Sequence, residues 1–238
     1  MKKAIIIGAT SGIGRELVKL LVNNNYKVGI TGRRVSLLNE IKLENPDSYV
    51  VASFDITNYS HVSQYLDTLV AELGGSDLII LSSGTGDNND SLDFRIEKET
   101  IDTNVAGFTC ALDWAFNFFE KQGFGHLVAI SSIGGLRGSR LAPAYNASKA
   151  YQINYLEGLR QKAVKSRKPI TVTDIRPGLV DTNMAKGDGL FWVMPVEKTA
   201  KQIMSAINRK KKVAYVTKRW KLIAFILKVM PKMLYDRM

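Results

Sequence analysis

Residues 3–21, KAIIIGATSGIGRELVKLL, join an apolar run to an amphipathic one through Gly8, Gly12 and Gly14. The first run is short and rich in β-branched residues, as in a buried strand, whereas the second has helical spacing. Glycines at such a junction let a diphosphate approach the backbone, and the helix N-terminus offers free N–H groups with partial positive charge. The stretch therefore predicts a dinucleotide-binding turn, although taken alone it also fits an ordinary glycine-rich turn.

The rest of the chain repeats this alternation of short apolar runs with longer amphipathic segments. Strands are predicted at 3–7, 26–31, 48–54, 77–83, 126–132, 169–175 and 212–217. Helices are predicted at 12–24, 34–44, 58–73, 98–121, 143–166 and 195–209. Several strands are apolar throughout, which indicates helices on both faces, and the alternation favours right-handed crossovers. We therefore expect an α/β fold with a single Rossmann-type, doubly wound parallel sheet of about seven strands and helices on both faces.

The length and composition fit one globular domain. The chain has 238 residues, of which 45% are hydrophobic and 23% charged, enough for a sizeable core. Its single cysteine, Cys110, excludes an internal disulfide and fits a reducing compartment, and no cluster of ligands predicts a metal site. The two histidines, His61 and His126, are expected at the surface or in turns. No run approaches the ~18 apolar residues of a membrane span, so we expect a cytoplasmic protein.

Basic residues concentrate at the C-terminal end. Residues 208–238 hold ten Lys or Arg against one acidic residue, which accounts for +9 of the net charge of +11. On a helical wheel the lysines of residues 219–238 share one edge and the apolar residues cover a broad opposite arc, with Pro231 as a break. We therefore divide the chain into a body, residues 1–218, and a basic amphipathic helical tail, residues 219–238.

The tail has two interpretations. It could pack on the body or on a second subunit with its lysines in solvent. Alternatively, it could lie on an anionic membrane as an interfacial helix, which would associate the protein peripherally with that membrane. Nucleic-acid binding is not expected, since the basicity lacks a recognised binding fold.

The end of the second predicted strand carries arginines where an acid would bind an adenosine ribose. From Lys27 to Arg34 there is no Asp or Glu, and Arg33 and Arg34 follow the strand directly. An acidic side chain there would accept the ribose hydroxyls of NAD, whereas arginines suit the 2′-phosphate of NADP. Both could also be ordinary solvated arginines. We interpret them as a preference for NADP(H) over NAD(H).

Tyr145 and Lys149 lie four residues apart in YNASKA, residues 145–150, so on a helix they would share a face. With nine tyrosines in the chain, about one such pair is expected by chance, so further matches must decide. The chain also has Ser132 thirteen residues before Tyr145, Asn104 in DTNVAG, Asp55 in FDIT, and RPGLVDT at 176–182. Together with the GxxxGxG turn, these motifs make the chain resemble the short-chain dehydrogenase/reductase family over about residues 4–217.

The resemblance implies an oxidoreductase of the EC 1.1.1 type, acting on CH–OH and C=O groups of a small-molecule carbonyl or alcohol. Hydride addition to a ketone leaves negative charge on oxygen, so the site needs a proton donor and a hydrogen bond to that oxygen. In the family's pattern Tyr145 is the general acid or base, and Ser132 polarises the carbonyl. Lys149 binds the nicotinamide ribose, and Asn104 anchors a water in a proton relay. The Lys149 ammonium is also expected to lower the pKa of Tyr145.

The family pattern assigns the cofactor contacts as well. They fall on Gly8, Thr10, Ser11, Gly12, Ile13, Gly14, Arg33, Arg34, Asp55, Ile56, Ser83, Gly84, Asn104, Tyr145, Lys149, Pro177, Gly178, Val180 and Thr182. One departure is LSSG at 81–84, where the family usually has NNAG, and it changes the side chains beside the cofactor. The polar loop TGDNNDS that follows is expected near the cleft. The resemblance also implies a homodimer or homotetramer.

Residues 183–194, NMAKGDGLFWVM, fall where the family usually has a mobile loop over the substrate. An apolar inner surface from Phe191 and Trp192, hinged at Gly187 and Gly189, would favour an apolar substrate, unless these residues simply pack on the body. Two rival functions remain. One is a nonenzymatic NADPH-binding sensor, and the other is a membrane-surface scaffold in which the fold mainly carries the tail.

Overall fold

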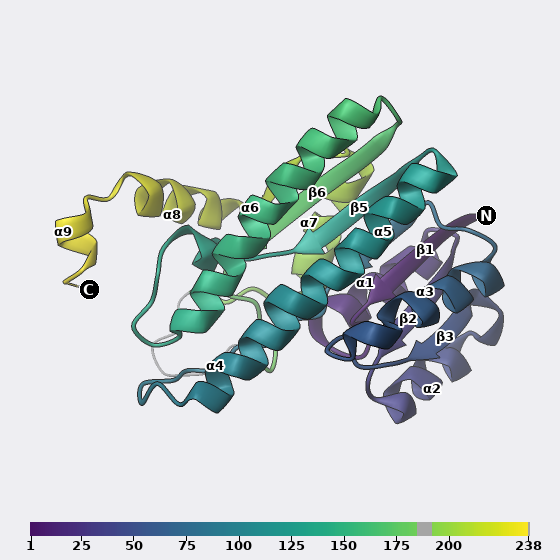
Figure 1. The fold of residues 1–238 in the computed structure, drawn as a ribbon, viewed down its shortest axis with the longest axis horizontal. Helices are drawn as coiled ribbons and strands as arrows, with labels where there is room; N and C mark the ends of the chain where they lie inside the picture. The colour runs from purple at the N-terminus through teal and green to yellow at the C-terminus, as the bar shows by residue number, and fades with distance from the viewer. Residues whose placement is uncertain (185–191, 238) are drawn as a thin grey trace.

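Seven parallel strands form one sheet in the part of the chain that the structure, a computed structural model, describes: residues 1–184 and 192–237 (Figure 1). The strands are β1 (Lys2–Ile7), β2 (Tyr26–Gly32), β3 (Tyr49–Ser53), β4 (Leu78–Leu81), β5 (Gly125–Ile130), β6 (Ile170–Pro177) and β7 (Val213–Val216). Their order across the sheet is β3-β2-β1-β4-β5-β6-β7. The chain therefore winds outward in both directions from the β1–β4 pair, which confirms the doubly wound sheet expected from the sequence.

Helices cover both faces of this sheet. One face carries α1 (Gly12–Asn23), α2 (Val35–Glu44) and α7 (Val196–Asn208). The other face carries α3 (Tyr59–Leu73), α5 (Phe108–Gln122) and α6 (Pro143–Ser166). Figure 1 shows α5 and α6 side by side across this second face. Two short 3-10 turns, Pro46–Ser48 and Ile133–Leu136, lie in the connections.

The side chains of β1 alternate between the two helical layers. Ala4 and Ile6 join the core under α1, α2 and α7, whereas Ile5 and Ile7 join the core under α3, α5 and α6. Each of the four is at most 1% exposed. Burying an isoleucine side chain contributes roughly 1.5–3 kcal/mol, so an uninterrupted apolar strand gains this stability only between two layers of helices.

The helix predicted at 98–121 starts earlier in the structure and has an interruption. It begins with α4 (Phe94–Ile101), continues through a π-helical turn (Asp102–Gly107) and ends with α5. Asp93 caps the start, since its carboxylate accepts a 2.9 Å hydrogen bond from a backbone N–H of the first turn. The π-helical turn holds Asn104, in keeping with the frequent occurrence of such turns at functional sites.

The tail forms α8 (Lys218–Val229) and α9 (Lys232–Tyr235), separated at Pro231 as predicted. Arg137, which lies shortly before α6, ties α8 to the body, because its Nε donates a 2.7 Å hydrogen bond to the Leu227 carbonyl. In Figure 1 the two tail helices extend to one side of the sheet. Among the described residues, no helix has the length and apolar character needed to span a membrane.

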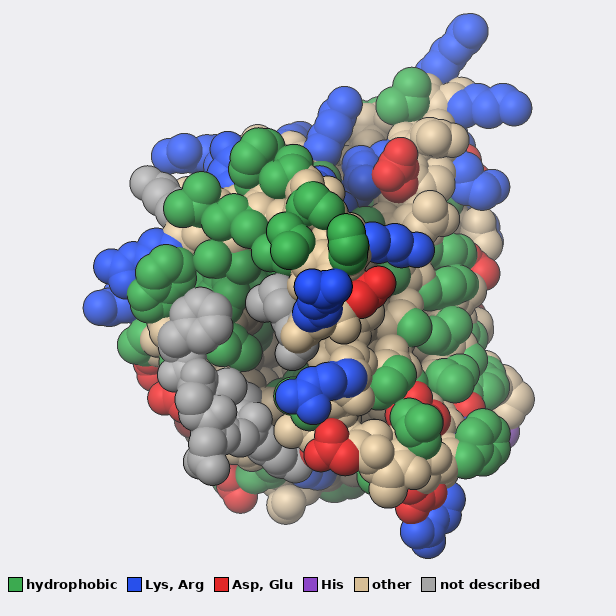
Figure 2. Space-filling model, turned by 90° about the vertical axis from the view of Figure 1, so that its left-hand side faces the viewer, with side chains coloured by type: hydrophobic (Ala, Val, Ile, Leu, Met, Phe, Trp, Pro, Cys, Tyr) green, Lys and Arg blue, Asp and Glu red, His purple; other side chains and the backbone are tan. Residues whose placement is uncertain are grey.

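Apolar side chains occupy two opposite faces of α8. Trp220 and Ala224 are 4% and 1% exposed and pack on the body. On the outer face Leu222, Phe225 and Val229 are 60%, 62% and 61% exposed. Figure 2 shows hydrophobic side chains gathered on the side of the molecule that carries the tail, with Lys and Arg side chains around them. The inner face therefore attaches the tail to the body, while the outer face is open to solvent.

The expectation that both histidines lie at the surface is wrong for His126, although His61 is exposed. His126 lies on β5, is 8% exposed, and has its Nε2 2.8 Å from the Thr173 hydroxyl on the neighbouring strand β6. That hydroxyl donates its own proton to the Lys211 carbonyl at 2.6 Å, so His126 must donate from Nε2. Burial, and then the charge of Lys210, lower the pKa of His126 to about 4. His126 is therefore a neutral link between two strands.

Candidate active site

A cleft of about 600 Å³ opens at the carboxyl ends of β1 and β4, where the winding of the sheet reverses. Open α/β sheets bind their ligands at this place. Of the residues predicted for cofactor binding and catalysis, the cleft is lined by Gly8, Thr10, Ser11, Gly12, Ile13, Arg33, Arg34, Asp55, Ile56, Ser83, Gly84, Ser132, Tyr145, Lys149, Pro177, Gly178, Val180 and Thr182. The two that do not line it are Gly14 and Asn104.

The glycine-rich turn forms one end of this cleft. Gly8 and Gly12 have φ angles of +95° and +53°, which side chains rarely allow. A Cβ at Gly8 would lie 2.6 Å from the Ser83 nitrogen, and one at Gly14 would lie 1.9 Å from the Gly8 carbonyl oxygen. Gly14 therefore permits the close packing of α1 on the turn, which explains why it does not line the cleft. The first turn of α1 has no acidic residue and no side-chain cap, so its N–H groups suit an anion.

Two arginines approach the same end of the cleft from the end of β2. Arg34 donates hydrogen bonds to the Thr10 hydroxyl from Nε, at 3.1 Å, and from Nη2, at 2.6 Å. A nitrogen of Arg33, Nη1, lies 3.7 Å from a carboxylate oxygen of Asp55. Burial alone would raise the pKa of Asp55, but hydrogen bonds from Thr57 and the charge of Arg33 lower it below its ordinary value. The cleft therefore has two guanidinium groups beside an anion-binding turn, as a phosphate requires.

The LSSG segment keeps its backbone against the glycine-rich turn. The Ser82 and Ser83 N–H groups both donate to the Ile7 carbonyl, at 2.8 and 3.0 Å. The departure from NNAG therefore still leaves the end of β4 bonded to the end of β1. The polar loop that follows lies near the cleft as expected, since Thr85 is part of the cleft lining.

Ser132 and Tyr145 approach each other beside Gly134. A Cβ at Gly134 would lie 3.3 Å from Ser132 Oγ and 3.5 Å from Tyr145 Cε1. Ser132 caps the short turn that follows it, where its Oγ accepts the Gly134 N–H at 3.0 Å. Burial raises the pKa of Tyr145, and a hydrogen bond with Ser132 partly offsets that rise. In the protein by itself burial therefore dominates, and the lowering expected from Lys149 stays a prediction for the complex with the oxidised cofactor.

Lys149 is 3% exposed, and its ammonium group has two hydrogen-bond acceptors. Nζ donates to the Ile130 carbonyl at 3.2 Å and to Gln152 Oε1 at 3.0 Å, and it lies 5.7 Å from the centre of the Tyr145 ring. Burial lowers the pKa of Lys149 to about 8, although the negative charge of Asp174 acts in the opposite direction. Burial therefore weakens the preference of Lys149 for its charged form.

Asn104 is fully buried and holds the loop after β4 in place. Its Oδ1 accepts the Thr85 N–H at 2.9 Å, and its Nδ2 donates to the Thr85 carbonyl at 2.6 Å and to the Ser148 hydroxyl at 3.1 Å. The side-chain amide is therefore fully engaged, which explains why it does not line the cleft. Its main-chain carbonyl accepts a 2.9 Å hydrogen bond from Gln152 Nε2.

Two polar residues of α6 belong to this network although the sequence analysis did not single them out. Asn146 donates from Nδ2 to the carbonyls of Gly134 and Arg137, at 2.8 and 2.9 Å, and so ties the turn after β5 to α6. Gln152 is fully buried. It follows Lys149 by three positions, so both lie on one side of the helix. The three-residue spacing from Lys149 on a predicted helix is the sequence feature that could have identified Gln152 as its neighbour.

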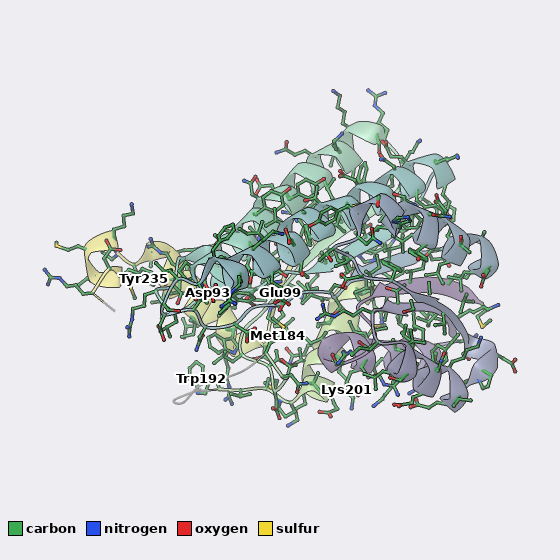
Figure 3. The ribbon with its side chains drawn as sticks, turned by 60° about the horizontal axis from the view of Figure 1, so that its bottom comes forward. Asp93, Glu99, Met184, Trp192, Lys201 and Tyr235 are labelled. Carbon is green, nitrogen blue, oxygen red and sulfur yellow. The ribbon has the colours of Figure 1, made fainter. Side chains whose placement is uncertain are left out.

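The chain after β6 forms another wall of the cleft, and the tail packs behind it. A Cβ at Gly178 would lie 2.1 Å from the Trp220 ring, so α8 and the cleft wall are in direct contact. Trp220 also meets Trp192 edge to face, with ring centres 6.4 Å apart. Figure 3 shows Trp192 and Met184, which flank residues 185–191, on one side of the molecule. Of the predicted lid, Gly187, Gly189 and Phe191 lie outside the described residues.

The donor set fits a nicotinamide dinucleotide. One end of the cleft combines a backbone without Cβ atoms, free helix N–H groups and two guanidinium groups, and the other end has a hydroxyl, a phenol and an ammonium. Within residues 1–184 and 192–237 there is no group of three His, Cys, Asp or Glu side chains that could hold a metal ion.

Comparison with known proteins identifies the family. The family model of the short chain dehydrogenases matches residues 2–189. The chain belongs to the short-chain dehydrogenase family. An uncharacterized oxidoreductase of Mycobacterium tuberculosis is 31% identical to this short-chain dehydrogenase over 217 residues, which cover 87% of this chain and 85% of the relative. The protein is therefore an oxidoreductase of this family.

Solved structures share the fold of this short-chain dehydrogenase. ElxO with NADP bound has a TM-score of 0.80 at 21% identity, and the match covers 90% of this chain and 96% of that one. The 3-ketoacyl-(acyl-carrier-protein) reductase from Brucella melitensis complexed with NADH has a TM-score of 0.82 at 19% identity, with the same coverage of 90% and 96%. The two proteins hold different cofactors, so the shared fold does not decide between NADP and NAD.

Proposed function

We propose that the protein uses NADPH to reduce a carbonyl group of an apolar small molecule, or catalyses the reverse oxidation of a secondary alcohol. The proposal rests on the approach of Ser132 and Tyr145 beside Gly134, with Lys149 one helical turn further on, in the cleft that also contains the glycine-rich turn. A nonenzymatic sensor is not favoured, because cofactor binding alone does not require a phenol next to a hydroxyl.

Each side chain has a role in the proposed reaction. A bound NADPH supplies the hydride that adds to the carbonyl carbon. Ser132 donates a hydrogen bond to the carbonyl oxygen as negative charge develops there, and Tyr145 transfers its phenolic proton to that oxygen. In the oxidation the Tyr145 phenolate accepts the alcohol proton. Of the three N–H donors of Lys149, two bond to Ile130 and Gln152, so one remains for a ribose hydroxyl.

The preference for NADP(H) is supported by the end of β2. Arg34 is held by the Thr10 hydroxyl beside the anion-binding turn, so its guanidinium is oriented before a phosphate arrives. The Arg33 side chain is 66% exposed, so it is free to turn from Asp55 toward a ribose phosphate. No acidic residue occupies this strand end to repel that phosphate.

An apolar substrate is supported by the wall after β6, where the cleft lining includes Leu179, Val180, Met184 and Val196. The test is a panel of apolar and polar carbonyls and alcohols with each cofactor, followed by NADPH absorbance. We expect turnover of apolar carbonyls with NADPH. No turnover with either cofactor, in a protein that binds NADPH, would favour the sensor.

We propose a homodimer or homotetramer, supported by rings on the face formed by α5 and α6. Two stacked pairs lie there, with ring centres 5.5 and 5.6 Å apart: Trp114 with Phe118, and Tyr151 with Tyr155. Aromatic side chains are enriched in protein interfaces, so this face suits a second copy of the chain. Light scattering on a sizing column measures the mass, and a monomer at micromolar concentration would contradict the proposal.

We also propose that the chain divides at residues 218 and 219 into a body and a tail, and that the outer face of the tail contacts an anionic membrane. A helix that is apolar on both faces needs a second apolar surface. A second copy of the tail would bring like charges together, because residues 208–238 carry +9. An anionic membrane instead offers both an apolar interior and opposite charge.

A further inference from the structure

A buried glutamine joins the predicted cofactor-binding lysine to the π-helical turn. Gln152 is 0% exposed, and both ends of its amide are bonded: Oε1 accepts from Lys149 Nζ at 3.0 Å, and Nε2 donates to the Asn104 carbonyl at 2.9 Å. An ammonium can only donate and a carbonyl can only accept, so the partners fix the orientation of the amide. Gln152 lies on α6 with Lys149, whereas Asn104 lies in the π-helical turn between α4 and α5, so the amide connects the lysine to a second element.

We propose that Gln152 is a positioning residue that fixes the Lys149 ammonium by linking it to the main-chain carbonyl of Asn104. The inference rests on the proposed function, in which that ammonium binds the cofactor ribose beside Tyr145. Gln152 itself does not line the cleft, so it acts only through Lys149.

The chemistry of the link explains why an amide is needed at this position. An apolar side chain at position 152 could fill the same space, but the ammonium would lose its Gln152 acceptor and keep the Ile130 carbonyl, and the Asn104 carbonyl would lose its Gln152 donor. Unpaired polar groups in a buried site are unfavourable, and a buried ammonium responds by losing its proton. Gln152 therefore both orients Lys149 and favours its charged form.

Other ionisable groups around Lys149 also affect its pKa. Asp174 on β6 favours the ammonium, but its carboxylate also accepts a 2.7 Å hydrogen bond from Arg176 Nε, and this partner reduces the field at Lys149. Burial raises the pKa of Tyr145, one turn earlier on α6, and so favours its uncharged form. The end of β5 supplies the Ile130 carbonyl oxygen to the ammonium, and Gln152, which contacts the ammonium on another side, is itself bonded to the Asn104 carbonyl. Gln152 therefore contacts Lys149 as a neutral hydrogen-bond acceptor, beside the opposing effects of burial and Asp174 on the pKa of the lysine.

The link also changes the expected proton relay. The family resemblance implies that Asn104 anchors a water in a proton relay, whereas here an amide bonds to the main-chain carbonyl of Asn104 and to Lys149. A carboxamide holds its protons tightly near neutral pH, so it supports the ammonium without passing a proton along. We therefore expect Gln152 to affect the charge and orientation of Lys149 rather than the delivery of protons.

The test measures NADPH affinity from pH 6 to pH 10 by NADPH fluorescence for the full chain and for Gln152→Leu and Gln152→Glu. In the unmodified protein we expect affinity to fall as Lys149 loses its proton, and Lys149→Met should lack that pH-dependent fall. Gln152→Leu should move the midpoint to lower pH by roughly one unit, a tenfold change in the ionisation constant. Gln152→Glu, which adds a negative charge, should move it to higher pH.

A purely structural role makes a different prediction. Ala163→Gly, a buried change about three turns further along α6, should lower the melting temperature and leave the midpoint unchanged. If Gln152→Leu behaves in the same way, or if the unmodified affinity does not depend on pH, the inference is wrong. If Gln152→Leu does not fold, the test is the midpoint of the pH dependence in Gln152→Glu. A shift to higher pH supports the inference, and an unchanged or lower midpoint contradicts it. An unmodified protein that binds neither NADPH nor NADH would instead overturn the proposed function and the inference with it.

Discussion

Arg34 donates two hydrogen bonds to the hydroxyl of Thr10, so the end of β2 is attached to the glycine-rich turn of β1. In the proposed function this guanidinium binds the 2′-phosphate of NADP, and its planar shape suits phosphate oxygens. This relationship makes the cofactor preference testable at single side chains.

Arg34→Gln should lower NADPH affinity on the order of 10- to 100-fold and change NADH affinity far less, because a hydrogen bond to a charged group contributes about 1.5–3 kcal/mol. Arg33→Asp should shift the preference toward NADH, because the phosphate would then meet a like charge. Fluorescence titration with each cofactor measures both effects. Arg95→Gln, whose parent side chain is 90% exposed on α4, is the matched control. Equal affinities of the unmodified protein for NADPH and NADH would refute the assignment.

Tyr145→Phe should reduce turnover by at least the ~10²-fold typical of losing a general acid, while NADPH affinity and melting temperature stay nearly unchanged, since the ring is retained. Steady-state kinetics with the best carbonyl from the panel checks the first part. Tyr151→Phe, on the same helix, removes a hydroxyl that lies 2.7 Å from Thr109 Oγ1 and should retain turnover. Retained turnover in Tyr145→Phe would show that the proton comes from another group.

The unmodified chain should sediment with anionic liposomes at low salt and be released as salt increases, because each Lys or Arg near the bilayer contributes about 1 kcal/mol. The double variant Phe225→Ser and Val229→Ser should sediment much less. Val164→Ser removes a 74% exposed valine of α6 and serves as the control. Truncation after Lys218 is a poorer experiment, because it also removes Trp220 from the cleft wall.

If the double variant and the unmodified chain sediment equally, the outer face of α8 does not contact the lipid. If neither sediments at low salt, the membrane proposal fails entirely. The interpretation of the tail as a helix that only packs on the protein would then remain.

Because of His126, the free energy of unfolding should decrease as the pH falls. Its pKa is about 4 in the folded protein and ~6.5 when unfolded, so the unfolded state binds the proton more readily between these values. The stability that depends on neutral His126 is therefore fully present above pH ~6.5 and is lost as pH falls to about 4, by roughly 3 kcal/mol in total. Urea unfolding at a series of pH values should show a shallower slope for His126→Gln. An unchanged slope would mean that other groups cause the acid sensitivity.

The strands were predictable to within a few residues because parallel strands between two layers of helices are apolar on every side. The run Ala4–Ile7 is an example, since each of its side chains is buried in one of the two cores on either side of the sheet. The family resemblance likewise predicted most of the residues that line the cleft, from Gly8 to Thr182, with Gly14 and Asn104 as the exceptions.

The features that could not be predicted from the sequence depend on contacts between segments that are distant along the chain. His126 is buried by a partner on the next strand, 47 residues away, and the charge pattern around it gives no sign of this. Gln152 bonds to a carbonyl 48 residues earlier, in a π-helical turn that no local pattern marks. The tail was correctly expected to be amphipathic and broken at Pro231, but a helical wheel cannot show that the body covers only half of the apolar arc.

The contact between Trp220 and Gly178 limits how these positions can change in descent. The indole ring fills the volume that any side chain at 178 would need, so even Gly178→Ala requires a smaller residue at 220 or a displaced helix. In relatives whose tail packs on the body in the same way, the residues at positions 178 and 220 should covary. In relatives that lack the tail, residues larger than glycine should be tolerated at position 178. The last twenty residues and the rim of the catalytic cleft would then be inherited as one module.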